Sequence, residues 1–175
     1  MERIAYLIAT GFYSGRGPRI KGQAVGGTYG SLAALLFCIF FLWMNNPRDY
    51  AAATILIFAA GLLSVPLAEK AIGPEENHKG IIVRRDQNSI TIDEWLGIFI
   101  SLAPVMYMTP SWWMAVPASV GFIGFRIFDT RKPPVVRYFD RMKSSCGVML
   151  DDFAAGTCTI PFTAAATVLT SAVIS

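Results

Sequence analysis

The sequence has little charge, and this shortage excludes whole classes of protein. Only 15% of the 175 residues are Asp, Glu, Lys or Arg, whereas soluble globular domains have about a quarter. Hydrophobic residues make up 54% of the chain, and the mean hydropathy is +0.48. The net charge of +3 comes without a basic stripe interleaved with aromatic residues, which argues against a nucleic-acid partner. The composition and length therefore favour a single membrane-embedded domain over residues 1–175.

Cysteine and histidine are also scarce. Cys38, Cys146 and Cys158 share no CxxC spacing, so we interpret them as packing residues rather than as metal ligands or disulfides. The one histidine, His78, lies in a polar stretch beside "PEEN", and we interpret it as a solvated surface residue. Thiolate and histidine chemistry are therefore poor candidates for a function.

Apolar runs, in contrast, are abundant. Five of them cover about 31–44, 51–68, 95–108, 112–125 and 153–174. Several are shorter than the roughly 20 residues that a perpendicular span needs. The pattern predicts an all-α, polytopic membrane bundle with short helices, in which the two middle runs form a hairpin that either crosses fully or is re-entrant. Residues 81–92 alternate enough to predict a small β-hairpin, with "DQN" as its turn.

The basic residues indicate which way the chain faces. Fourteen of the 15 lysines and arginines lie in 1–30, 69–94 and 126–152, and only Arg48 lies elsewhere. Even numbers of apolar runs separate these three segments, so all three fall on one face whether or not the hairpin crosses fully. By the positive-inside rule, that face is cytoplasmic. We therefore expect the N-terminus and any polar site on the cytoplasmic side.

Five carboxylates border the apolar runs on this same face: Asp93, Glu94, Asp129, Asp151 and Asp152. Helix capping accounts for Asp93 or Asp151 singly. It does not account for the second acid of each pair, nor for Asp129 after a run, where the helix dipole disfavours an anion. Packed together, the five would repel one another. A hard cation such as Mg²⁺, which binds carboxylates, waters and phosphate oxygens, would remove the conflict, and we predict a metal site here.

Basic and small residues near these acids suggest the other half of a phosphate site. The basic ones are Arg126, Arg131 and Lys132, which flank Asp129. The small ones come from "AVGGTYGSLAA" and are Gly27, Thr28, Gly30 and Ser31. Backbone N–H groups at a glycine-rich helix entry can approach an anion. Two alternatives stay open: the glycines could serve tight helix packing, and the basic residues could anchor lipid headgroups.

Four motifs, "VGGTYGSL", "DQNSITIDEWLG", "FRIFDTRKPPV" and "GVMLDDFAAG", resemble the phosphatidylglycerophosphatase A family in order and context, over about residues 11–157. The resemblance implies a Mg²⁺-dependent hydrolase of the bacterial inner membrane that converts phosphatidylglycerophosphate to phosphatidylglycerol in phospholipid biosynthesis. It implies a phospholipid substrate in the bilayer.

The resemblance also assigns expected roles. The catalytic residues would be Asp129, Lys132 and Asp152. The metal ligands would come from the five carboxylates, with Asp86 as a supporting acid. The chain departs from the family at Gly26 and Gln87, where the family usually has proline, and in the longer stretch 73–85. The attacking nucleophile, the number of metal ions, the headgroup preference and the oligomeric state stay open.

Other functions fit less well. Phosphatidic-acid-type phosphatases depend on histidine, and neither a DxDx[TV] start nor a DxxDG series is present. A small membrane cation carrier or a non-catalytic lipid-binding subunit is the alternative of a different class. Carriers usually hold charges inside their spans, whereas here the acids cluster at one boundary.

Overall fold

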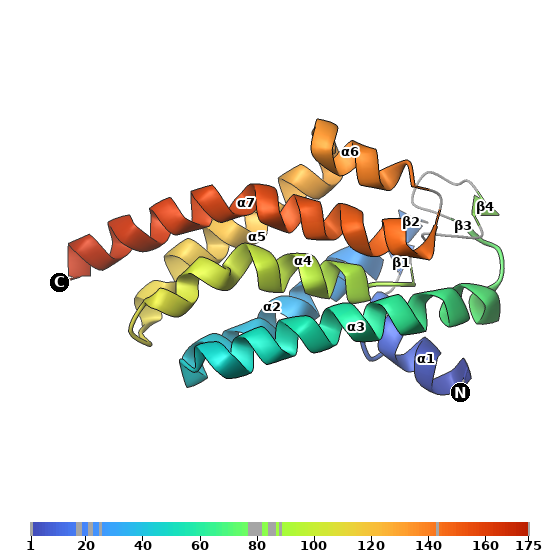
Figure 1. Ribbon diagram of the computed structural model, residues 1–175, viewed down its shortest axis with the longest axis horizontal. Coiled ribbons are helices and arrows are strands. Elements are labelled where there is room, and N and C mark those ends of the chain that lie inside the picture. Colours follow the sequence, from blue (N-terminus) through green and yellow to red (C-terminus); the bar gives the residue numbers. More distant parts are fainter. Residues whose placement is uncertain are drawn as a thin grey trace.

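The computed structural model describes residues 2–16, 19–20, 23–24, 26–76, 82–83, 87, 89–142 and 144–174. Its long helices are α2 (Gly26–Met44), α3 (Pro47–Ile72), α5 (Ala115–Arg131) and α7 (Ser145–Ile174). The shorter α-helices are α1 (Glu2–Ala9), α4 (Ile92–Leu102) and α6 (Pro134–Asp140). Three 3₁₀ segments are η1 (Ser14–Arg16), η2 (Ala103–Tyr107) and η3 (Trp112–Met114). Figure 1 shows α2, α3, α4, α5 and α7 running lengthwise through one elongated bundle.

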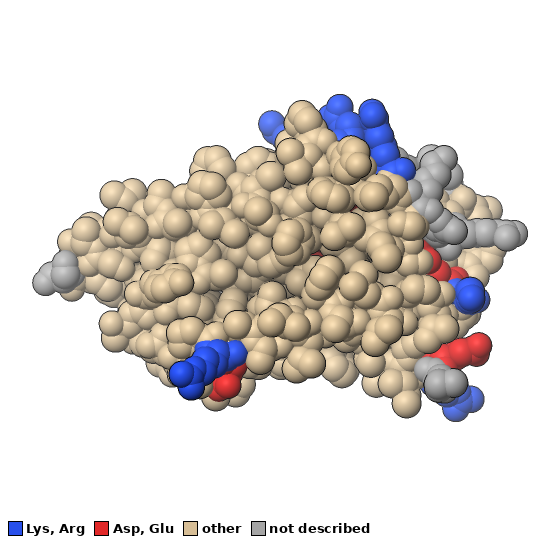
Figure 2. All heavy atoms as spheres, in the orientation of Figure 1, with Lys and Arg blue, Asp and Glu red and all other residues tan. Residues whose placement is uncertain are grey.

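The predicted all-α membrane-type bundle is confirmed. Within the described part of the chain, α2, α3 and α7 are each long and apolar enough to cross a membrane. Their outward faces are apolar, as at Leu36, Leu63 and Val173, which are all exposed. Figure 2 shows a broad middle zone without charged side chains on this face, with Lys, Arg, Asp and Glu confined to the ends and the upper rim.

The middle hairpin extends along the whole length of α2. α4 begins beside the start of α2, where Thr91 lies against Gly30, and its turn reaches the other end, where the rings of Trp43 and Trp112 are 5.9 Å apart. α4 has only 11 residues, but the 3₁₀ segment η2 continues it at about 2.0 Å per residue. Together they span about 27 Å, close to the roughly 28 Å of α2. The hairpin is thus about as long as α2, and whether it crosses the membrane fully stays open.

The strands are short and differ from the predicted hairpin. β1 (Arg19–Ile20) pairs with β2 (Gln23–Ala24), and β4 (Ile82–Val83) pairs with β3 (Glu75–Glu76), both antiparallel. The hairpin predicted over 81–92 is wrong in its second strand, because Ile92 already begins α4. Ile90 and Thr91 are both buried, and the Thr91 N–H donates to the Ala9 carbonyl at 2.9 Å. Asp86 and Asn88, both in the predicted turn, lie outside the described residues.

Glycines permit a close contact between α4 and α7. A Cβ added to Gly156 would lie 2.6 Å from the Gly97 carbonyl oxygen, so the two backbones nearly touch. A Cβ added to Gly97 would collide with the Phe125 ring of α5. This close approach places the start of α4 directly against the first half of α7.

We expect Gly156→Ala to lower the free energy of unfolding by about 1–3 kcal/mol, because the backbone carbonyl it would strike cannot rotate away. Gly61→Ala is the matched control, since its new methyl group would meet only the flexible end of Met149. Both changes bring the same gain in helix propensity, so their difference isolates the clash. Denaturant unfolding in detergent, followed by helicity, measures both, and equal stability of the two variants would contradict this packing.

Candidate active site

Five carboxylates lie at the end of the bundle where α2, α4 and α7 begin, at the right in Figure 1. They are Asp93 and Glu94 of α4, Asp129 of α5, and Asp151 and Asp152 of α7. Asp152 is at their centre: it is only 4% exposed, and its carboxylate experiences the negative charge of the other four. The structure therefore brings together all five acids that the sequence singled out at this boundary.

Capping does not explain the pair in α7. That helix begins at Ser145, six residues before Asp151, so neither acid is at its end. Both acids are buried because α4, α5 and α6 pack around the first half of α7. Asp93 lies in the first turn of α4, where the helix dipole favours an anion. The N-cap of that helix is Thr91, which makes no side-chain capping bond.

Arg126 of α5 connects three helices. Its Nη1 atom donates to Ser31 Oγ of α2 at 3.1 Å, to Glu94 Oε1 of α4 at 3.4 Å and to Asp129 Oδ2 at 3.2 Å. Ser31 is fully buried and also donates to the Gly27 carbonyl at 2.9 Å. Arg126 thus compensates two of the five carboxylates and fixes their helices relative to one another.

The glycine-rich segment differs from the expected loop. Gly26 is already the first residue of α2, so Thr28, Gly30 and Ser31 lie in the first turns of a helix. A Cβ on Gly27 would collide with Glu94 Oε1, and one on Gly30 would lie 2.7 Å from Glu94 Oε2. The glycines therefore make room for Glu94, and Thr28 and Tyr29 have exposed side chains near the helix start.

Lys132 ends α5 in the left-handed conformation, with φ of 44°, and its N–H donates to the Phe128 carbonyl. Its ammonium donates to Asp151 Oδ2 at 2.9 Å and also to Asp140. Partial burial disfavours the charged form, but the charges and hydrogen bonds of Asp151 and Asp140 outweigh it and raise the pKa of Lys132 above its usual range. Lys132 is therefore a permanent cation at neutral pH.

Asp140 is a site residue that the sequence reasoning missed. It belongs to α6, a helix that restarts directly after Lys132 because Pro134 fits the first helical position. The available signal was an acid among basic residues in "RYFDR". Of the other expected residues, Arg131 is exposed and forms no ion pair with the acids among the described residues, and Asp86 lies outside them.

Comparison with known proteins decides the family. The family model described as "Phosphatidylglycerophosphatase A" matches residues 7–167. The chain belongs to the phosphatidylglycerophosphatase A family. A relative from Haemophilus influenzae named phosphatidylglycerophosphatase A is 32% identical over 151 residues, which cover 86% of this chain and 80% of the relative. A relative of the same name from Escherichia coli is 34% identical over 153 residues, which cover 86% of this chain and 76% of the relative. The family resemblance read from the four motifs is thus confirmed.

A third relative, from Bacteroides thetaiotaomicron, is named as a candidate phosphatidylinositol-3-phosphatase. It is 34% identical over 155 residues, which cover 86% of this chain and 85% of its own. No solved structure matches the chain. The relatives named phosphatidylglycerophosphatase A and this differently named relative have nearly the same sequence identity to the chain. Identity alone therefore does not indicate which lipid headgroup the chain recognises.

The charge balance of this phosphatidylglycerophosphatase A site is negative. Arg126 contacts Glu94 and Asp129, and Lys132 contacts Asp151 and Asp140. Within the described part of the chain, no basic group contacts the buried Asp152 carboxylate. The described acids also do not form a ready-made cage of three or more metal ligands. The donors are carboxylate and hydroxyl oxygens, which suit a hard cation.

Lys132 should react more slowly than the exposed Lys70 with an amine-acylating reagent at mildly alkaline pH, because a raised pKa leaves less free amine. Asp140→Asn removes one cause of that raised pKa, so acylation of Lys132 should become faster, by about tenfold for each pKa unit lost. Asp49→Asn, an exposed acid at the other end of the bundle, is the control and should change nothing. Peptide mass spectrometry measures the rates. Unchanged Lys132 reactivity in Asp140→Asn would refute the pairing.

Proposed function

We propose that this protein is a Mg²⁺-dependent phosphatidylglycerophosphatase that removes the terminal phosphate of phosphatidylglycerophosphate. One observation carries the proposal: the buried Asp152 lies among four other carboxylates without a basic partner among the described residues. Such a carboxylate is costly to bury, unless a cation joins it. Two relatives that cover most of the chain are named for this activity.

The residues that would hold the metal are Asp152 and a subset of Asp93, Glu94, Asp129 and Asp151. A bound Mg²⁺ supplies a positive charge opposite the phosphate and acidifies a water molecule. A few carboxylates suffice, because Mg²⁺ usually completes its coordination with waters and substrate phosphate oxygens. The absence of a three-acid cage among the described residues is compatible with this mode of binding.

Two cations of the chain are suited to bind the phosphate itself. Lys132 stays charged at neutral pH and is partly exposed, and Arg126 is also partly exposed. Both already touch carboxylates of the cluster, so an incoming phosphate would share them with those acids. Fixed charges of this kind stabilise the charge that develops on the phosphoryl oxygens during hydrolysis. The bond between phosphorus and the lipid oxygen breaks, and the phosphoryl group passes to water.

The position of the cluster suits a lipid substrate. The acids lie at one end of a bundle whose middle zone is free of charge in Figure 2, so a headgroup could meet them while the acyl chains remain beside the helices. By the positive-inside rule, this end faces the cytoplasm. We infer a location in the bacterial inner membrane with the site on the cytoplasmic side.

Purified protein should release phosphate from detergent-dispersed phosphatidylglycerophosphate in the presence of Mg²⁺, and EDTA should abolish the release, because the acids alone would repel the substrate. Phosphatidylinositol 3-phosphate, tested in parallel, addresses the function suggested by the relative from Bacteroides thetaiotaomicron. A higher kcat/KM for that lipid would replace the proposed substrate. Folded protein that releases phosphate from neither lipid would overturn the phosphatase assignment.

Asp152→Asn should lower the rate of phosphate release by at least about a hundredfold, because it removes the central charge of the cluster. Asp49→Asn, far from the cluster at the start of α3, is the control and should keep full activity. Circular dichroism of both variants checks that the bundle is intact. Near-normal turnover by Asp152→Asn would show that the acid cluster is not the active site.

A further inference from the structure

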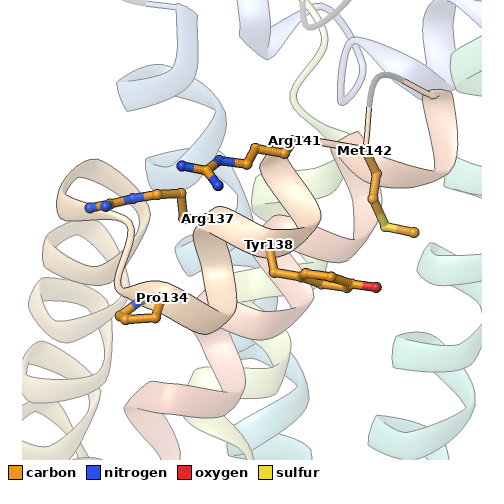
Figure 3. A pocket seen from close by; sticks show the side chains of 5 residues that line it. All are labelled: Pro134, Arg137, Tyr138, Arg141 and Met142. Atoms are coloured by element: carbon orange, nitrogen blue, oxygen red, sulfur yellow. The ribbon is translucent and has the colours of Figure 1, made fainter.

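A second basic site lies on α6, separate from the acid cluster. Arg137 and Arg141 are both exposed and are one helical turn apart, so their side chains share a face. Figure 3 shows both extending to the same side of the helix. Among the described residues, neither forms an ion pair. Two like charges at this spacing repel each other, and an anion held between them would remove the repulsion.

The neighbouring face of α6 is apolar and also exposed. Tyr138 is 65% exposed and Met142 is 42% exposed, and Figure 3 shows them on the side opposite the two arginines. Pro134, Tyr138 and Met142 line a shallow cleft of about 590 Å³ together with the arginines. Exposed large apolar residues beside unpaired cations are typical of a helix that lies in a membrane interface.

The position of α6 agrees with this arrangement. The helix lies between the end of α5 and the start of α7, at the boundary where these apolar helices end. Its inward residue Val136 is fully buried and its Asp140 holds Lys132, so the helix is fixed to the bundle. In Figure 2, Lys and Arg side chains gather along the upper rim, over α6.

We propose that α6 binds the headgroups of anionic phospholipids of the surrounding leaflet. Arg137 and Arg141 contact the phosphate oxygens, while Tyr138 and Met142 enter the region of the first acyl-chain carbons. Guanidinium groups bind phosphate oxygens in a bidentate manner, and tyrosine is favoured at the membrane interface. The site recognises lipids that are not cleaved, so it is independent of the phosphatase activity proposed above.

The test uses the full-length protein in detergent, titrated with phosphatidylserine or phosphatidylcholine, with bound lipid counted by native mass spectrometry. Phosphatidylserine carries no phosphomonoester, so it reports on binding without turnover. The variant is R137Q/R141Q. The control is R48Q, which removes an exposed arginine at the opposite end of the bundle, at the start of α3. Thermal unfolding checks that all proteins are folded.

Wild type should bind phosphatidylserine more tightly than R137Q/R141Q by about ten- to thirtyfold, since each basic residue near an anionic surface contributes about 1 kcal/mol and 1.4 kcal/mol is tenfold. R48Q should bind like wild type, and phosphatidylcholine should bind all three proteins equally. Excess inorganic phosphate should not displace the lipid. Equal phosphatidylserine binding by wild type and R137Q/R141Q, an equal loss in R48Q, or displacement by free phosphate would each overturn the proposal.

Discussion

The burial of Asp152 among four other carboxylates constrains everything around it. Asp152 is 4% exposed, and the charges of Asp93, Glu94, Asp129 and Asp151 all act on its carboxylate. Arg126 and Lys132 compensate the outer acids, but neither contacts Asp152. A bundle that concentrates negative charge in this way gains nothing in stability from it, because like charges at short range repel. The proposed cation would offset this negative charge and allow a phosphate to approach it.

Holding these acids together requires helices that approach more closely than ordinary side chains allow. Gly97 and Gly156 bring the backbones of α4 and α7 nearly into contact, and Gly27 and Gly30 leave space for Glu94 beside α2. Without a hydrophobic driving force between helices in lipid, such small residues are the usual means of close association. The glycines of the "VGGTYGSL" motif therefore act on the site through packing, by allowing Glu94 to reach Arg126, which also donates to Ser31.

Much of the fold and of the candidate site could be predicted from the sequence, because hydrophobicity indicates which segments lie in the membrane and charge indicates which lie at its surface. The length of the apolar runs indicated a helical membrane bundle. Asp129 and the two acid pairs lie at the ends of these runs, which indicated that these acids lie close together. Residue alternation in 81–92 was misleading, since Ile90 and Thr91 are both buried and the Thr91 N–H donates to the Ala9 carbonyl of the N-terminal segment. Asp140 was missed because its partner, Lys132, lies across a left-handed turn whose geometry no local pattern shows. That α2 begins at Gly26, ahead of the apolar run from residue 31, was missed because glycine is a poor guide to where a membrane helix begins.

The short helix α6 connects the two polar regions of the molecule. Through Asp140 it holds Lys132, which also contacts Asp151 of the acid cluster. It presents Arg137 and Arg141 on one side and Tyr138 and Met142 on the opposite side. A helix fixed inward by an ion pair and outward by lipid headgroups would keep Lys132 at the depth where a phospholipid phosphate lies. The depth of the active site relative to the membrane surface would then follow from α6 and the two residues after it, Arg141 and Met142.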